Sequence, residues 1–301
     1  MASPITQTTS TKPSNRLGVI IALLLLYFVW GSTYLGNKIA IETVAPFPML
    51  TIRFLLAGTL LYTFLRLRGV PNPTRQQWKA SGTAGILLLN CGLGLVVFSQ
   101  QWVASSLAAI IVATMPLWLA LFSRFFGERT TFIEIIGMIL GVIGVALLNG
   151  EADLRAHPLA LLVFVGPICW AFGSAYSRKL SQPKGLMSSA VQMLVAGVVF
   201  GLFTWLSGEA YVVPSLRSRL AILYLTFFGS IVAYSAYIYL LEQRVRPALA
   251  TSYAYINPLI AVMLGVGLAG EVISPLGYGG MAIILVSVAL VVMAKSFKRA
   301  R

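Results

Sequence analysis

Long apolar runs alternate with short charged or turn-forming breaks along almost the whole chain. Each run approaches the roughly 20 residues that an α-helix needs to cross the hydrocarbon core of a bilayer. The pattern therefore predicts an all-α membrane protein with ten transmembrane helices. We expect these spans near residues 17–37, 47–66, 80–100, 106–126, 131–149, 158–178, 187–207, 220–241, 248–269 and 274–294.

Composition supports this prediction. Hydrophobic residues make up 58% of the chain and charged residues only 10%, whereas about a quarter of an ordinary soluble domain is charged. Residues 1–16 contain hydroxyl and turn-forming side chains without apolar periodicity, which predicts a disordered cytoplasmic tail. The first apolar run continues through Trp30 to Tyr34 without a small-residue cleavage site, so we expect a permanent helix rather than a signal peptide.

The net charge of +14 could indicate a nucleic-acid partner, but the positions of the charges favour a membrane instead. If the N-terminus is cytoplasmic, only four of the 22 Lys and Arg residues lie in external loops, namely Lys38, Arg155, Arg217 and Arg219, and Arg53 lies within a span. This asymmetry predicts that both termini, including a basic tail at 295–301, face the cytoplasm. The expected partner of the basic surface is anionic membrane lipid, with no nucleic acid.

The two halves of the chain resemble each other. Residues 112–148 align with residues 252–292, and shorter matches extend the alignment towards the N-terminus. The aligned positions include Pro116 with Pro258, Glu128 with Glu271, Gly31–Tyr34 with Gly173–Tyr176, and Leu55–Gly58 with Leu194–Gly197.

This repeat divides the chain into two five-span domains, residues 17–149 and 158–294. Because five is odd, equivalent helices must cross the membrane in opposite directions, so Glu128 should be cytoplasmic and Glu271 external. Inverted repeats of this kind build many secondary transporters, which hold the substrate between the two halves. The repeat thus predicts a transporter that works by alternating access.

Several motifs also carry a family resemblance. They are WGSTYLGNKIA after the first apolar run, the Arg of PMLTIRFLLAG, a proline in the fourth and ninth spans, and a GE…GM…GV..L pattern that closes each half. Together they resemble the drug/metabolite transporter (DMT) superfamily, and specifically its EamA-type ten-helix exporters. ALATSYAYINP and WAFGSAYSRKL most resemble the YedA-like branch.

The resemblance covers Leu17 to Ala294. It implies a proton-linked or exchange-linked exporter of amino acids, related metabolites or drugs in a bacterial inner membrane. It does not imply one substrate, and the oligomeric state stays open. The chain reads FSQQWVASS where an acidic residue followed by histidine is expected in relatives, which weighs against a proton relay at that point.

Two prolines at repeat-equivalent positions predict helix kinks. Pro258 has no N–H for the helix ladder, so the ninth span should loosen near Asn257, and Pro116 should act in the same way in the fourth. Such breaks persist in a bilayer where they are buried in protein or line a cavity. Packing alone and a cavity wall are both consistent with this pattern.

Polar and aromatic side chains within the spans are the candidates for a substrate site. Arg53 is the deepest basic residue, and it either attracts a substrate carboxylate, with Lys38 nearby, or bonds to backbone carbonyls. Aromatic rings suit amphipathic ligands, because apolar groups stack on them while a few polar groups orient the ligand. The candidate substrate-binding residues are Trp30, Tyr34, Arg53, Asn90, Gln101, Trp170, Gln192, Tyr234, Tyr253 and Asn257.

Acidic side chains are not expected in the middle of any span. Glu134 lies three residues after Thr131, which is the spacing of a capping box at a helix start, and Ser274 before Pro275 predicts another N-cap. A pump with a central carboxylate is therefore poorly supported, and exchange or facilitated diffusion remains open.

Other classes of protein fit the sequence less well. One His and one Asp rule out an intramembrane aspartate pair and argue against a histidine metal site, so we expect no catalytic residues, metal or cofactor. A channel or membrane interaction protein is the non-transport alternative, but no polar stripe along a pore is visible. The alternative within the superfamily is a phosphorylated-sugar or nucleotide-sugar exchanger, for which one or more paired deep Lys or Arg residues would be expected, and only Arg53 qualifies.

Overall fold

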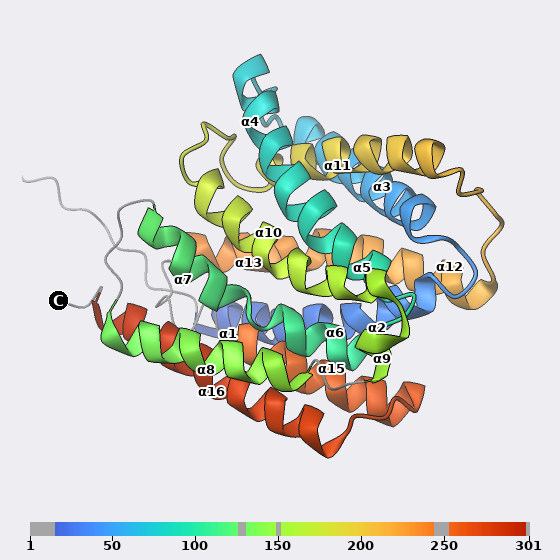
Figure 1. Ribbon diagram of the computed structural model, residues 1–301. Helices are drawn as coiled ribbons and strands as arrows, with labels where there is room; N and C mark the ends of the chain where they lie inside the picture. Colours follow the sequence, from blue (N-terminus) through green and yellow to red (C-terminus); the bar gives the residue numbers. More distant parts are fainter. Residues whose placement is uncertain (1–15, 126–130, 149–151, 244–252, 299–301) are drawn as a thin grey trace, which may run out of the picture.

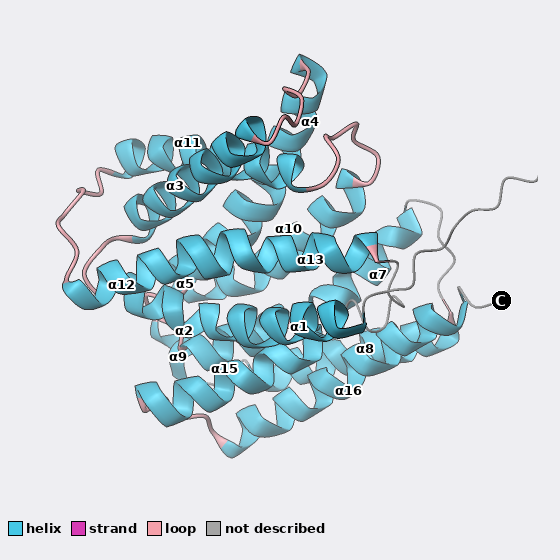
Figure 2. Cartoon of the chain, turned by 180° about the vertical axis from the view of Figure 1, so that it is seen from behind, coloured by secondary structure: helices cyan, strands magenta, loops and turns pink. Residues whose placement is uncertain are grey.

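The computed structural model describes residues 16–125, 131–148, 152–243 and 253–298. Within these ranges the chain forms helices joined by short loops and contains no strand (Figures 1 and 2). The N-terminal tail and Glu128 lie outside the described residues. The all-α architecture is confirmed.

The first half is a succession of long helices, some of them divided into consecutive segments. We write α for α-helices and η for π-helical or 3₁₀ segments. The elements are α1 (Arg16–Leu25), η1 (Leu26–Trp30), α2 (Gly31–Ala40), α3 (Pro46–Leu67), α4 (Arg75–Gly85), η2 (Ile86–Gly94), α5 (Leu95–Ser99), α6 (Ser105–Val112), α7 (Met115–Phe125) and α8 (Phe132–Leu148).

The second half follows the same plan after a short connecting helix. The elements are α9 (Ala152–Ala156), η3 (Pro158–Leu161), α10 (Leu162–Ser177), α11 (Leu186–Ser207), α12 (Leu216–Tyr224), η4 (Leu225–Val232), α13 (Ala233–Glu242), α15 (Tyr253–Ala269) and α16 (Pro275–Lys298).

Seven helices or helix series in the described part of the chain are long and apolar enough to cross a membrane. Three shorter apolar helices, at 132–147, 256–269 and 275–291, occupy the places of the predicted fifth, ninth and tenth spans. The structure thus supports a multi-pass membrane protein, while the count of ten spans stays a prediction.

Opposite directions of equivalent helices are visible in Figure 1. The series from α1 to α2 runs towards the edge where the loops at 41–45, 100–104 and 270–274 gather, whereas its repeat equivalent α10 starts at that edge and runs away from it. Following the charge asymmetry of the sequence, we call this edge the outer end and the opposite edge the inner end. The two halves are therefore inverted repeats.

Pairing between the halves follows the same symmetry. Helix α3 packs along its equivalent α11, and α8 packs along its equivalent α16. A Cβ atom on Gly58 of α3 would lie 2.8 Å from the backbone N of Leu194, and one on Gly197 of α11 would lie 2.8 Å from the backbone N of Leu55. The two contacts are reciprocal, because Gly58 aligns with Gly197 and Leu55 with Leu194. Small residues therefore let these two helices approach closely around the pseudo-two-fold axis.

Proline acts differently in the two equivalent helices. The fourth span is interrupted between α6 and α7, and Pro116 stands at the second position of α7. Pro258 instead lies inside α15, which is one helix from Tyr253 to Ala269. A further internal proline, Pro167, lies in α10.

Two predicted helix caps are confirmed. The backbone N–H of Thr131 donates to the carboxylate of Glu134 at 2.6 Å, and the N–H of Glu134 donates to the Thr131 hydroxyl at 3.3 Å. The Ser274 hydroxyl accepts from the N–H of Gly277 at 3.0 Å, so it caps α16. Local hydrogen-bond chemistry read from the sequence therefore fixes where α8 and α16 begin.

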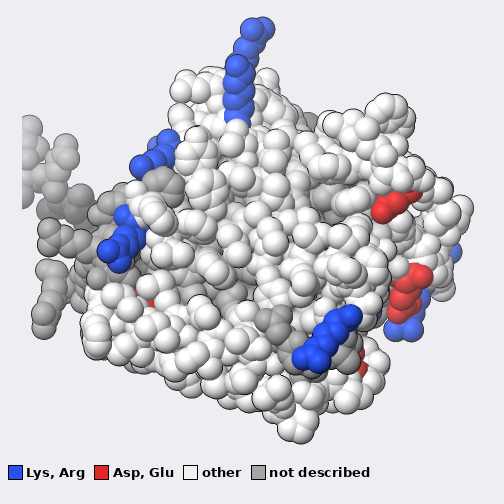
Figure 3. Space-filling view, viewed as in Figure 1, with Lys and Arg blue, Asp and Glu red and all other residues white. Residues whose placement is uncertain are grey.

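Apolar side chains cover the middle of the molecule. On the face shown in Figure 3, a wide uncharged band separates charged groups that lie towards the two ends. Many large apolar side chains of the described chain are exposed, such as Val142 on α8, Val198 on α11 and Met263 on α15. Such an apolar exterior suits contact with lipid acyl chains rather than water.

Candidate functional site

A central cavity lies between the two halves. Its walls come from α2, α3, η2, α10, η4 and α15, among other elements. Of the ten candidate residues, seven line it: Trp30, Tyr34, Arg53, Trp170, Tyr234, Tyr253 and Asn257.

Among the described residues that line the cavity, Arg53 is the only one with a charged side chain. It is only 3% exposed. Its Nε donates to the Ser230 hydroxyl at 3.1 Å and its Nη1 donates to Oδ1 of Asn37 at 3.0 Å. No Asp or Glu in the described part of the chain forms an ion pair with it. Because guanidinium has five N–H donors, three of them are left without a hydrogen-bond partner there.

Aromatic rings form the wall beside Arg53. The Trp30 ring contacts the Tyr253 ring edge to face at 5.0 Å and the Tyr234 ring at 5.6 Å between centroids. The Trp30 indole N–H donates to the carbonyl of Gly229 at 3.3 Å. This bond fixes the Trp30 ring while leaving part of it open to the cavity.

Two of the residues around Arg53 and Trp30 lie in η4, a π-helical segment. Gly229 accepts from Trp30, and its neighbour Ser230 accepts from Arg53. The wider turn of a π-helix shifts the side chains that follow it and is common at functional sites. Trp30 itself ends another π-helical segment, η1. The cavity is therefore built where the helices depart from regular geometry.

Asn257 links the ninth span to the first. In the orientation that satisfies its hydrogen bonds, its amide nitrogen donates to the carbonyls of Tyr27 and Tyr253, each at 3.2 Å. The carbonyl that loses its helix partner to Pro258 is that of Ala254, so Asn257 serves other acceptors. Its contact with Tyr27 joins α15 to η1, one from each half.

The other three candidate residues lie elsewhere. Asn90 donates to the carbonyl of Ala196 at 3.0 Å and ties η2 to α11. Gln101 is exposed in the turn that follows α5. Gln192 is half-buried near the inner end of α11, where its amide donates to Gln182 and Ser188.

Sequence reasoning missed Asn37 and Ser230. Asn37 stands near the end of a predicted span and Ser230 in an apolar run, so neither has a motif of its own. The signal that could have found them is Arg53, because a buried guanidinium requires acceptors. Lys38, proposed as a partner of Arg53, instead donates to the backbone carbonyls of Gln100 and Val103.

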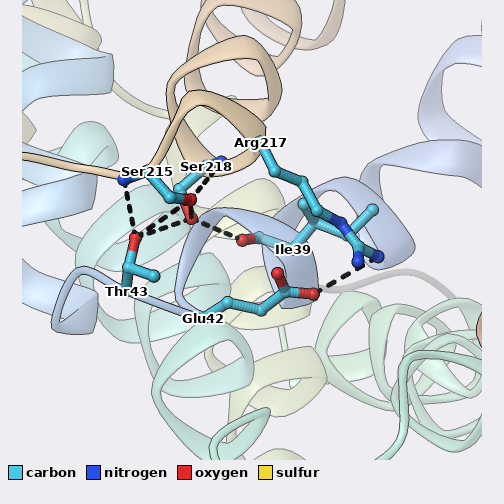
Figure 4. Close-up of polar contacts among 6 residues, drawn as sticks. All are labelled: Ile39, Glu42, Thr43, Ser215, Arg217 and Ser218. Atoms are coloured by element: carbon cyan, nitrogen blue, oxygen red, sulfur yellow. Dashed lines mark hydrogen bonds and ion pairs between the residues drawn. The ribbon is translucent and has the colours of Figure 1, made fainter.

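Polar contacts join the two halves at the outer end. The Ser218 hydroxyl at the start of α12 donates to the carbonyl of Ile39 at 3.0 Å and accepts from Thr43 at 2.9 Å, while Arg217 pairs with Glu42 at 3.4 Å (Figure 4). These bonds connect the end of the first span to the start of the eighth. A passage between these two helices would have to separate them.

The carboxylate of Glu271 makes a second contact at the outer end, between the loop after α15 and the start of α6. Both oxygens of Glu271 accept backbone N–H groups at the start of α6, from Ser105 at 2.7 Å and Ser106 at 2.9 Å. Burial alone would raise the pKa of Glu271, but the hydrogen bonds from Ser106 and Ser105 outweigh burial and lower it. The charged carboxylate therefore ties the loop after α15 to the fourth span.

Among the described residues, no group of three or more His, Cys, Asp or Glu side chains is placed so that it could hold a metal ion. Cys91 and Cys169 are free thiols.

Comparisons with known proteins agree with the geometry. The EamA-like transporter family matches residues 17–150 and again 157–293. The chain is 44% identical over 277 residues to the uncharacterized inner membrane transporter YedA of Escherichia coli K12, covering 91% of this chain and 90% of that protein. It is 24% identical to a WAT1-related chloroplast protein of Arabidopsis thaliana, covering 88% and 67%.

A solved crystal structure has the same fold, with a TM-score of 0.66 and 21% identity over 95% of this chain and 100% of the other. The two matches to one family model reproduce the internal repeat, and the similarity to YedA extends over almost the whole sequence. The chain belongs to the EamA-like transporter family of the drug/metabolite transporter superfamily and is a membrane transporter.

Proposed function

We propose that this protein is a secondary transporter that exports small amphipathic metabolites, amino acids or related compounds, across a bacterial inner membrane. Both termini face the cytoplasm in this proposal, as the charge asymmetry indicates. The observation that carries it is Arg53, a buried cation in the central cavity with three N–H donors left over and no ion-pair partner among the described residues.

A buried cation without a counter-charge is costly, because the protein interior solvates it poorly. A substrate carboxylate that reaches the unused donors of Arg53 removes part of this cost and can form two parallel N–H···O bonds. An anionic group should therefore bind most favourably beside Arg53. This favours substrates with a carboxylate at one end.

The rest of the cavity suits the other end of such a substrate. Trp30, Tyr234 and Tyr253 present ring edges and faces next to Arg53. Apolar and aromatic groups pack well on rings, while the indole and hydroxyl groups supply directed hydrogen bonds. An amino acid with an apolar side chain combines the two requirements.

Transport proceeds by alternating access between the inverted halves. Arg53 and Trp30 belong to the first half and Ser230 and Tyr253 to the second, so the site changes shape when the halves rock. Opening towards the outer end requires the contacts around Ser218 and Glu271 to part. Because the cavity lining includes no Asp or Glu among the described residues, we propose exchange rather than a central proton carrier.

The described cavity wall carries a single basic side chain, and this observation argues against the phosphorylated-sugar alternative. A phosphate ester carries about two negative charges at neutral pH. Arg53 alone would leave part of this charge unpaired in a buried site.

The first experiment is counterflow in proteoliposomes. Vesicles with purified protein are loaded with unlabelled L-phenylalanine, L-leucine or L-threonine, and uptake of the labelled compound is followed without a pH gradient. We expect accumulation of L-phenylalanine or L-leucine well above protein-free vesicles. If none of the three accumulates, and an imposed pH gradient changes nothing, the proposed substrate class is wrong.

Asn257→Ala tests whether the cavity is the route. We expect a counterflow rate lower by about two- to tenfold, because the bonds that join α15 to η1 are lost. Asn72→Ala is the matched control, since Asn72 lies in an exposed loop and accepts from Tyr62 far from the cavity. Equal rates in both variants, at equal membrane levels, would remove Asn257 from the site.

A further inference from the structure

Two uncharged acceptors, Asn37 and Ser230, hold the guanidinium of Arg53. The inference drawn from them rests on the proposed function. We propose that Asn37 and Ser230 are positioning residues that hold Arg53 without neutralising it, and that they thereby make the cavity selective for substrates with one anionic group.

The geometry of Asn37 supports the first part. The residue is 1% exposed in α2, and its Oδ1 accepts from Nη1 of Arg53 at 3.0 Å. An amide oxygen accepts a hydrogen bond from guanidinium but carries no full charge. It engages one N–H of Arg53 and leaves the positive charge available to a ligand.

Ser230 acts on the opposite edge of the guanidinium. It is fully buried in η4, and its hydroxyl accepts from Nε of Arg53 at 3.1 Å. A Cβ atom on the adjacent Gly229 would lie 3.4 Å from Nη2 of Arg53, so the absence of a side chain there leaves room beside that nitrogen. Asn37 and Ser230 thus use two donors, and Nη2 stays free.

The two acceptors come from different halves of the molecule. Asn37 belongs to the first span and Ser230 to the eighth, and the two spans pack against each other. Arg53, on α3, belongs to the same half as Asn37, so its bond to Ser230 is the one that crosses between the halves. We infer that this bond, and with it the affinity of the cavity for an anion, changes as the halves rock.

Asn37→Asp tests this directly. The carboxylate is nearly the same size as the amide, and it would supply the counter-charge that Arg53 lacks. We expect the half-saturating concentration of L-phenylalanine in counterflow to rise about ten- to hundredfold, because substrate and Asp compete for the same guanidinium. The variant should discriminate less between L-phenylalanine and L-phenylalaninamide, which lacks the carboxylate. Asn72→Asp in the exposed loop is the matched control and should leave both values unchanged.

A second readout does not depend on transport. In detergent solution Asn37→Asp should unfold at a higher temperature than the wild type, because it pairs a lone buried cation, whereas Asn37→Ala should unfold at a lower one. A purely packing role for Asn37 predicts that both variants are destabilised.

Ser230→Ala should raise the half-saturating concentration of L-phenylalanine about two- to tenfold and alter the maximal rate less. Ser235→Ala is its control, since the Ser235 hydroxyl donates to the carbonyl of Ile231 within its own helix series. Wild-type protein without counterflow would overturn the proposed function, while the unfolding temperatures would still decide whether Asn37 holds Arg53. A transporting wild type with unchanged selectivity in Asn37→Asp would overturn the positioning role alone.

Discussion

Arg53 and Gln192 occupy equivalent places in the two halves but stand in different surroundings. The alignment that sets Leu55–Gly58 on Leu194–Gly197 also sets Arg53 on Gln192. Arg53 is 3% exposed and lines the cavity. Gln192 is half-buried near the inner end, where it bonds to Gln182 and Ser188 of its own half.

The difference shows how a symmetric fold acquires an asymmetric site. The backbones around both residues keep the symmetry, as the reciprocal contacts of Gly58 and Gly197 show. A charge was placed in only one of the two positions. In an inverted repeat, one charged cavity residue is enough to bind an anion, and its equivalent is free to serve packing.

Replacing Arg53 by the side chain of its equivalent, glutamine, gives the largest expected effect. Arg53→Gln makes the first half resemble the second, keeps a polar side chain beside Asn37 and Ser230, and removes the charge. We expect L-phenylalanine counterflow to fall about 30-fold or more, since a buried charge contact is lost. The measurement is initial counterflow rate at equal protein per vesicle.

Gln192→Ala is the matched change in the other half. It removes the bonds to Gln182 and Ser188, and this loss should lower the free energy of unfolding by about 1 kcal/mol. The counterflow rate should stay within about twofold of the wild-type rate. Comparable losses in Arg53→Gln and Gln192→Ala would mean that both positions serve the site and that the asymmetry is only geometric.

The second prediction concerns the feature that the halves share. Gly58→Ala and Gly197→Ala each place a Cβ atom 2.8 Å from a backbone nitrogen of the facing helix. Overpacking of this kind costs about 1–3 kcal/mol, so each variant should unfold at a temperature roughly 2–10 °C lower. The two decreases should be similar, because the contacts are equivalent.

Gly267→Ala provides the control, because no atom lies within 4 Å of the added methyl group. It should unfold at or slightly above the wild-type temperature, since alanine favours helix over glycine. A large decrease for only one of Gly58→Ala and Gly197→Ala would contradict the symmetric packing of α3 and α11.

Fold-level features could be predicted from the sequence because they rest on repeated or local signals. Apolar run length identifies the helices, the repeat with an odd number of spans gives the inversion, and the Thr131–Glu134 spacing gives a cap whose hydrogen bonds are confirmed. Each signal involves residues near one another in sequence or repeated at a fixed distance.

The candidate site could be predicted only in part, because its contacts join residues far apart in the chain. Arg53 stands out by charge, but its partners Asn37 and Ser230 are ordinary polar residues on two other helices. The π-helical turns that aim Ser230 and Trp30 leave no pattern in the sequence. Gln101 and Gln192 carry the same amide group as the cavity residues Asn37 and Asn257. Their positions outside the cavity follow from the fold and cannot be seen in the sequence.

The smallest expected effect compares the aligned carboxylates Glu271 and Glu128. The folded pKa of Glu271 is lowered by its bonds to Ser105 and Ser106, although burial opposes this. Its stabilising contribution is therefore complete above the unfolded pKa of about 4.3 and is lost as the pH falls through the lower folded value. Glu271→Gln removes the charge and should reduce the unfolding free energy at pH 7 by about 1 kcal/mol, since the carboxylate is only half-buried.

Unfolding temperatures of wild type, Glu271→Gln and Glu128→Gln, measured from pH 7 down to pH 3, test this. The difference between wild type and Glu271→Gln should be constant above pH 5 and shrink below it, because protonation of Glu271 then removes the charge in the wild type as well. Glu128 lies outside the described residues, but the repeat predicts the same pH-dependent difference for Glu128→Gln. If the pH-dependent difference in unfolding temperature is seen for Glu271→Gln but not for Glu128→Gln, the carboxylate contact, like the cavity arginine, belongs to one half of the molecule only. A difference that does not shrink at low pH would mean that Glu271 acts through its shape rather than its charge.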